Sequence, residues 1–192
     1  RFDKDPEKPV RLIEEMEGLV DEILWPLCKA WPKAERWILP GNHEDRLRRF
    51  LWREAKALGG VVFWEGMFQF ERLGFKSEKK SLSVGHLEVM HGEYLSKHSG
   101  MTAKAHLDRY GTSILVGHSH RLGSFYKTDM RGPHGAWEIG CLCDLNPEYE
   151  KFPNWQQGWA VVTLWPSGLF NVQLVALIDR TKVIFGGKEW GV

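Results

Sequence analysis

The chain has 192 residues, 43% of them hydrophobic, and a formal net charge of +1, so it is long and apolar enough for one domain with a packed core. The near-neutral charge gives no general argument for a nucleic-acid, membrane-surface or acidic partner. No apolar run approaches the roughly 18 residues that a spanning helix requires, and no secretory signal pattern is visible. Three cysteines do not make a disulfide framework, and they favour a reducing, cytoplasmic setting.

The first half of the sequence predicts helices around one short strand. Apolar residues recur at helical spacing over 9–25, and Pro26 and Pro32 are expected to end this helix. The segment "RWIL" (36–39) is typical of a short strand. A second helix is predicted over "EDRLRRFLWREAKAL" (44–58), where two glycines follow.

The second half changes from mixed elements to strands. "HLEVM" (86–90) predicts a strand, "MTAKAHLDRY" (101–110) a helix and "ILV" (114–116) a short buried strand. Further strands are predicted for "GSFYKT", "AWEIG", "WAVVTLW" and "LFNVQLVALI", the last two joined by a "PSG" hairpin turn. No repeat, low-complexity tract or linker is visible, so residues 1–192 are predicted to form a single α/β domain.

Three predicted strands end in segments that carry possible metal ligands. "ILPGNHE" places Asn42 and His43 after one strand, "EVMHGEY" places His91 after another, and "ILVGHSHRLG" places His118 and His120 after a third. A lone H-x-H is more often a polar loop than a metal site. In open α/β sheets, ligands bind beyond the carboxyl ends of the strands. Because possible ligands follow three predicted strands here, a metal site is favoured. Imidazole with an amide oxygen suits manganese, iron or zinc rather than calcium.

These motifs stand in the order found in the calcineurin-like metallophosphoesterases, a family that the chain resembles. The matching residues are Gly41-Asn42-His43-Glu44, His91-Gly92 and Gly117-His118-Ser119-His120. The resemblance is closest to the phage-type branch, through "RFDKDP", "PGNHEDRLRR", "KHSG", "GCLC" and "PNWQQG". It implies a metallophosphatase-type β-sandwich flanked by helices, with two divalent metal ions (manganese, iron or zinc) that serve the hydrolysis of a phosphate ester.

The resemblance also implies a role for each matching residue. Asn42, His91 and His118 are expected to hold one metal ion, and His120 is expected to hold the other. His43 is expected to lie beside the scissile phosphate, where it protonates the leaving oxygen or stabilises the transition state. Substrate candidates are phosphate esters that include nucleic acids and nucleotides, and a phage-encoded protein of this kind would act in the host cytoplasm. No membrane partner is expected.

The family's first two motifs, Asp-x-His and Gly-Asp, are absent from the chain, which begins with Arg1. They would supply three ligands, including the aspartate that bridges the two metals. We therefore expect a domain that lacks its first one or two strands, one bound ion or none, and self-association across the edge that the missing strands leave. The alternative is an inactive or degenerate binding or structural protein of the same fold.

Other polar residues have two interpretations each. Arg46, Arg49 and Arg53 share one helical face and either attract a phosphate or form a solvated surface, and we keep Arg46 as a substrate-binding candidate. His98 in "KHSG" is the second substrate-binding candidate, although an exposed loop histidine is the commoner explanation.

The remaining histidines and two cysteines are predicted to be structural. An odd offset from His91 places His86 on the opposite face of its strand. His106 and His134 are expected at the surface. Cys141 and Cys143 are expected to be small apolar side chains of a buried strand, because zinc sites normally show wider spacing between cysteines.

Overall fold

The structure is a computed structural model that describes residues 12–77, 80–147 and 152–191. The chain divides into two compact units, residues 1–80 and 81–192, which are described here one by one. Helices and strands are both present, so the predicted mixed α/β class is confirmed, while the single domain over 1–192 stays a prediction. No helix within the described ranges has the length and apolar character that a membrane crossing requires.

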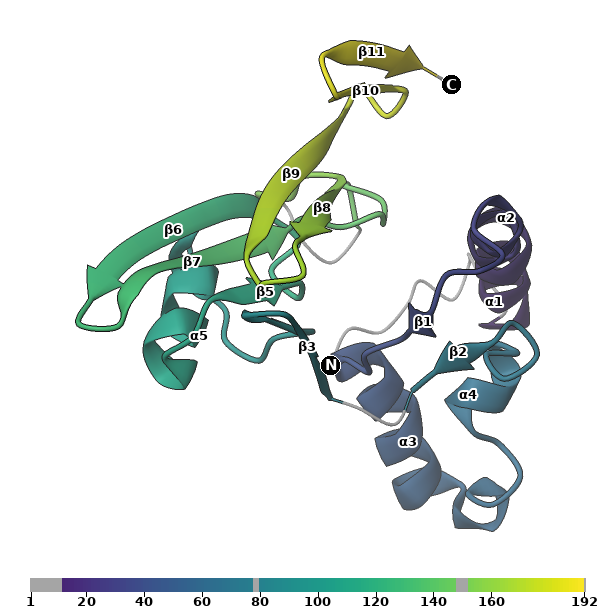
Figure 1. Ribbon diagram of the computed structural model, residues 1–192. Coiled ribbons are helices and arrows are strands. Elements are labelled where there is room, and N and C mark those ends of the chain that lie inside the picture. The colour runs from purple at the N-terminus through teal and green to yellow at the C-terminus, as the bar shows by residue number, and fades with distance from the viewer. Residues whose placement is uncertain (1–11, 78–79, 148–151, 192) are drawn as a thin grey trace. The chain divides into compact units, whose positions relative to one another are not determined.

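Helices dominate the N-terminal unit (Figure 1). Its elements are α1 (Leu12–Gly18), the π-helical turn η1 (Leu19–Leu24), α2 (Trp25–Ala30), β1 (Arg36–Trp37), α3 (Asn42–Glu54), the 3-10 turn η2 (Lys56–Leu58), α4 (Trp64–Met67) and β2 (Phe75–Lys76). The two short strands pair in parallel. The buried apolar core of this unit consists of Val20, Leu24, Phe70 and Leu73.

Pro26 does not end the first helix, which corrects the sequence prediction. The helical backbone continues from α1 through η1 into α2, and Pro26 lies in the first turn of α2. The N–H of Trp25 donates to the carbonyl of Val20, five residues back. This wider turn shifts the hydrogen-bond register where proline has no N–H to donate. The chain leaves the helix at Trp31, directly before Pro32, six residues beyond the predicted end at residue 25.

The C-terminal unit consists of one helix and two sheets. Its elements are β3 (Ser81–Val84), β4 (Leu87–Met90), α5 (Met101–Tyr110), β5 (Ile114–Val116), β6 (Leu122–Asp129), β7 (Gly132–Ile139), β8 (Gly158–Leu164), β9 (Phe170–Ile178), β10 (Lys182–Phe185) and β11 (Lys188–Gly191). One sheet has the order β3-β4-β5-β7-β6, and the other has the order β11-β10-β9-β8. β4, β5 and β7 are parallel neighbours, and the strands at both edges are antiparallel to them.

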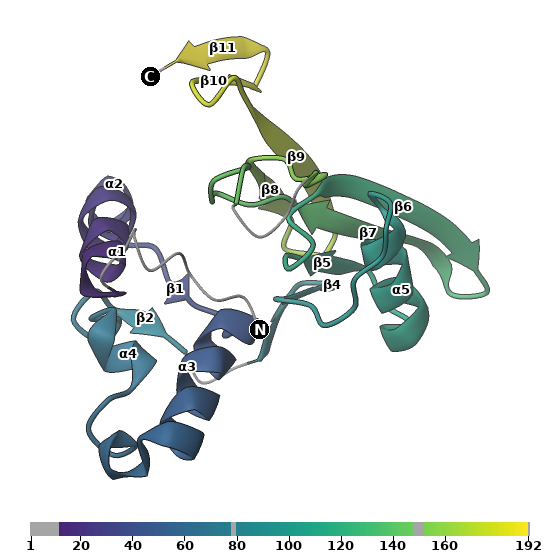
Figure 2. The ribbon, with the colours of Figure 1, turned by 180° about the vertical axis from the view of Figure 1, so that it is seen from behind.

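The five-stranded sheet is covered on both faces (Figures 1 and 2). The cluster on the side of α5 consists of Ala103, Leu107, Ile114, Val116 and Ala136. The cluster on the side of β8 and β9 consists of Leu87, Leu115 and Trp137, packed against residues such as Ala160, Val162 and Val172. Successive residues of a strand point to opposite faces, so β5 is apolar throughout because both of its faces are buried.

The C-terminal hairpin of β10 and β11 lies beyond the predicted strands. Gly186 and Gly187 join the two strands with φ angles of 62° and 75°. Two successive positive φ angles are what a two-residue hairpin turn of type I′ requires, and glycine adopts them at little cost. β10 pairs with the end of β9 at Lys182 and Val183, so the hairpin continues this sheet past the body of the unit (Figure 1).

Candidate metal centre

His91 and His118 meet beyond the carboxyl ends of two adjacent parallel strands. His91 directly follows β4, and His118 comes two residues after the end of β5. Nε2 of His91 lies 3.2 Å from Nδ1 of His118, and the two half-buried rings meet edge to face. Two imidazole nitrogens bound to one zinc ion lie about 3.0 to 3.4 Å apart. Their spacing fits two ligands of a single ion, and the binding of a metal ion by these residues stays a prediction.

The loop between β5 and β6 turns sharply around Ser119. His118 and His120 have φ angles of 64° and 58°, which are uncommon for residues with a β-carbon. The N–H of Ser119 donates to the carbonyl of Gly117 over 2.7 Å. The backbone at these two residues is not extended, so His118 faces His91 while His120 contacts a different group of residues.

Glu138 is a buried carboxylate that fixes this loop to the start of α5. Its side chain is fully buried in β7. One carboxylate oxygen accepts the N–H groups of Thr102 and Ala103 at 3.0 and 3.2 Å, and the other accepts the hydroxyl of Ser119 at 2.5 Å. A carboxylate at a helix N-terminus is also favoured by the helix dipole. The sequence prediction omits Glu138, although one acidic residue in the apolar "AWEIG" strand is a signal for it.

His106 is buried, and its predicted surface position is wrong. Its Nδ1 lies 2.8 Å from the carbonyl oxygen of Thr102, and its Nε2 accepts the N–H of Glu93 over 3.0 Å. This pattern requires the tautomer with the proton on Nδ1. A β-carbon on Gly92 would lie 3.3 Å from Nε2, so glycine permits this close approach. His106 therefore holds in place the segment that directly follows His91.

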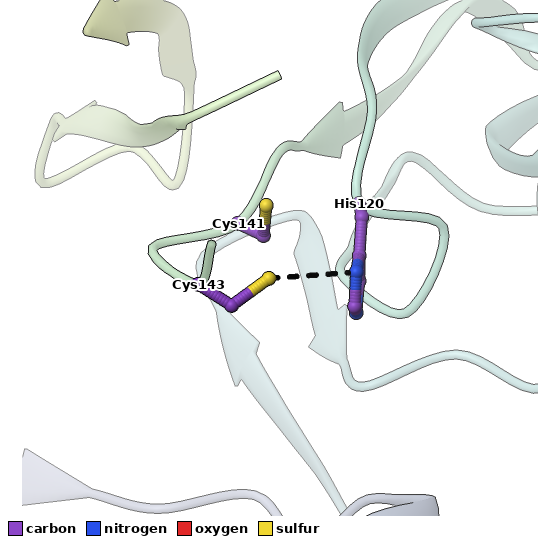
Figure 3. Close-up of side chains that lie close together, drawn as sticks. All are labelled: His120, Cys141 and Cys143. Carbon is purple, nitrogen blue, oxygen red and sulfur yellow. Dashed lines mark hydrogen bonds between the residues drawn. The ribbon is translucent and has the colours of Figure 1, made fainter. Parts of the chain in front are cut away.

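A second group of metal-ligating side chains surrounds His120 (Figure 3). Its Nδ1 lies 3.7 Å from Sγ of Cys143, and one ligand atom from each of His120, Cys141 and Cys143 lies within 4.8 Å of the others. The pKa of the Cys141 thiol is raised to about 12. Burial is the largest cause, and the hydrogen bond with Cys143 is the second. The predicted buried strand is wrong here, because β7 ends at Ile139 and Cys143 is exposed.

The residues of the "GNHE" motif belong to the N-terminal unit and begin α3. Gly41 is the N-cap, and its N–H donates to the carboxylate of Glu44 over 2.7 Å. Asn42 is half-buried, whereas His43 and Arg46 are exposed. The first helical turn therefore presents an amide, an imidazole and a guanidinium in close succession. The roles of Asn42 as a metal ligand and of His43 as a catalytic residue stay predictions.

The other histidines have structural surroundings. The N–H of His86 donates to the carbonyl of Gly168 over 3.1 Å, and a β-carbon on that glycine would lie 2.9 Å from the imidazole Nε2. His134 is half-buried rather than at the surface, with Nε2 3.0 Å from the carboxylate of Asp129. His98 is exposed at the approach to α5, and its role in substrate binding stays a prediction.

A cavity of about 470 Å³ opens elsewhere on the C-terminal unit. Its walls include Tyr126, His134, Trp137 and Phe170. None of the predicted metal ligands lines it, and His134 is the single histidine, cysteine or carboxylate among its lining residues. The motif histidines that follow β4 and β5 are therefore not part of this cavity.

Comparison with known proteins finds no matching family model. The chain is 31% identical to the Gene 54 protein of Mycobacterium phage D29 over 143 residues, and 31% identical to the Gene 54 protein of Mycobacterium phage L5 over 145 residues. Each match covers 65% of this chain and 54% of the relative, so the chain spans about half the length of these curated relatives. The similarity indicates a phage origin.

Proposed function

We propose that this protein is a metal-dependent phosphoesterase of the calcineurin-like class, with a phosphodiesterase-like or nuclease-like activity. The observation that carries the proposal is the 3.2 Å separation of His91 Nε2 and His118 Nδ1 at the ends of β4 and β5. The packing of two sheets with α5 on the outer face supports a metallophosphatase-type sandwich. The order of the three histidine-bearing motifs in the sequence supports the same class.

In this proposal, His91 and His118 hold one manganese, iron or zinc ion. Bound divalent ions supply Lewis acidity at a phosphoryl oxygen. His43 lies next to Asn42 in the first turn of α3, and its exposed imidazole donates a proton to the leaving-group oxygen.

The substrate class follows from the same residues. Arg46 lies one turn beyond His43 in α3, and its exposed guanidinium binds the phosphate with charge-assisted hydrogen bonds. His98 provides a further exposed donor at the substrate. Nucleic acids and nucleotides are the proposed phosphate esters, and the similarity to phage proteins supports action in the host cytoplasm.

Hydrolysis of bis-p-nitrophenyl phosphate by the purified chain tests the proposal. We expect slow, manganese-dependent turnover that falls at least about 100-fold in His118→Ala, because the loss of a ligand exceeds the 10-to-100-fold cost of losing an outer-shell partner. His86→Ala is the matched control, since this histidine is exposed in the same unit and lies outside the proposed centre. Equal rates for the wild type and a His91→Ala/His118→Ala double variant, both folded by circular dichroism, would favour the inactive alternative.

A further inference from the structure

We propose that His120, Cys141 and Cys143 form a separate binding site for a thiophilic cation, with zinc as the preferred ion. This site goes beyond the proposed function, because thiol ligands select a different class of metal from the oxygen and nitrogen ligands of a phosphoesterase. It does not depend on phosphate-ester hydrolysis at His91 and His118.

The positions of the ligand atoms fit zinc coordination. In a tetrahedral site with ordinary zinc–nitrogen and zinc–sulfur bonds, a nitrogen and a sulfur ligand lie about 3.6 Å apart. Nδ1 of His120 and Sγ of Cys143 are 3.7 Å apart, and Sγ of Cys141 completes a set in which all three ligand atoms lie within 4.8 Å (Figure 3). Small side-chain adjustments therefore bring all three onto one ion.

The backbone already holds these three residues together. The N–H of Gln156 donates to the carbonyl of His120 over 2.9 Å, and the carbonyl of Gln156 accepts the N–H of Cys141 over 3.1 Å. The side-chain amide of Gln157 donates to the carbonyl of Cys143 over 2.9 Å. The segment directly before β8 thus links His120, in the β5–β6 loop, to the two cysteines after β7. Because the backbone of the three residues is already held in place, little conformational entropy is lost when an ion binds.

Burial indicates how the ion would be reached. His120 and Cys141 are half-buried and Cys143 is exposed, so the site lies at the surface with one side open to solvent. Three protein ligands with a further position open to a small molecule characterise zinc sites at which exchange or chemistry occurs, whereas structural sites are closed by four protein ligands. The structure therefore assigns this site to exchangeable binding rather than to permanent reinforcement of the fold.

Cobalt titration of the full chain under reducing conditions tests the site. Thiolate coordination gives cobalt a charge-transfer absorption in the near ultraviolet. We expect this band in the wild type and its displacement by zinc but not by manganese. The band should be clearly weaker in Cys141→Ser and in Cys143→Ser, because each variant keeps only one thiol, and zinc should bind at least about 100-fold more weakly.

Two control variants make the result specific. Cys28→Ser replaces the remaining cysteine, which lies in the N-terminal unit, and should retain the band. His91→Ala/His118→Ala should also retain it, so failure of the phosphoesterase proposal is distinguishable from failure of this one. A wild type with free thiols and no band, or a band of equal intensity in Cys141→Ser, would overturn the proposal.

Discussion

Glu138 connects the two parts of the C-terminal unit that position His118 and His120. Its carboxylate accepts hydrogen bonds from two N–H groups of α5 and from the hydroxyl of Ser119, and all of these residues are buried. A buried donor that loses its acceptor costs about 1–3 kcal/mol. The geometry of the histidine loop therefore depends on a carboxylate that is not itself one of the proposed metal ligands.

Replacement of Glu138 should destabilise the protein according to how many of its hydrogen bonds remain. Glu138→Ala leaves three buried donors without an acceptor, and we expect a loss of about 3 kcal/mol in the free energy of unfolding. Glu138→Gln should cost clearly less, because its carbonyl oxygen still accepts from α5 and its amide can donate to the hydroxyl of Ser119. Urea denaturation at neutral pH measures both values, and losses below about 1 kcal/mol in both variants would contradict this role.

The pairing of His91 with His118 could be predicted because neighbouring parallel strands bring their carboxyl ends to one edge of a sheet. The burial of His106 could not be predicted in this way. It depends on a contact with the segment after His91, where the N–H of Glu93, 13 residues earlier in the sequence, donates to the imidazole. Nor could the position of the cysteines be predicted. Gly140 has a φ of 76° and turns the chain out of β7, so Cys141 and Cys143 leave the sheet.

The turn between β6 and β7 is organised by the carboxylate of Asp129. It accepts the N–H of Arg131 at 2.8 Å, lies 3.0 Å from Nε2 of His134, and pairs with the guanidinium of Arg131 at 3.2 Å. These contacts, with the backbone N–H of Arg131 contributing most, hold the pKa of Asp129 well below its ordinary value of 3.8. The ionised carboxylate therefore favours the folded hairpin.

The sign of the pH dependence follows from this lowered pKa. The contribution of Asp129 is fully present above its unfolded-state pKa of 3.8, and it is lost as the pH falls toward the lower pKa of the folded state. Asp129→Asn should therefore differ most from the wild type above pH 4, and the difference should shrink in acid. Carbon-detected NMR titration of the Asp129 carboxyl checks the cause, and a folded-state pKa at or above 3.8 would refute it.

Elements with clear local boundaries could be predicted best. The helix over 101–110 matches α5 at both ends, because Gly100 and Gly111 flank it with φ angles of 81° and 66°. The first helix could not be bounded from its sequence, since a π-helical turn accommodates Pro26 without ending the helix. The β10–β11 hairpin has a signal in the sequence, the Gly186-Gly187 pair at its turn.

At the scale of the whole molecule, the candidate ligands divide between the two units. The C-terminal unit supplies His91 and His118 from two strand ends, and it supplies the complete set around His120. The N-terminal unit supplies Asn42 and His43 from the start of α3. His91, His118 and the proposed zinc site therefore all belong to the C-terminal unit.

The central claim is that His91 and His118 bind one metal ion, and manganese titration calorimetry tests it most directly. Manganese is the suitable ion because the thiol-containing site should not bind it. A Cys141→Ser/Cys143→Ser variant should bind manganese like the wild type. Replacement of both His91 and His118 by alanine should weaken manganese binding at least about 100-fold. Binding that is unchanged in the folded double-alanine variant would contradict the claim.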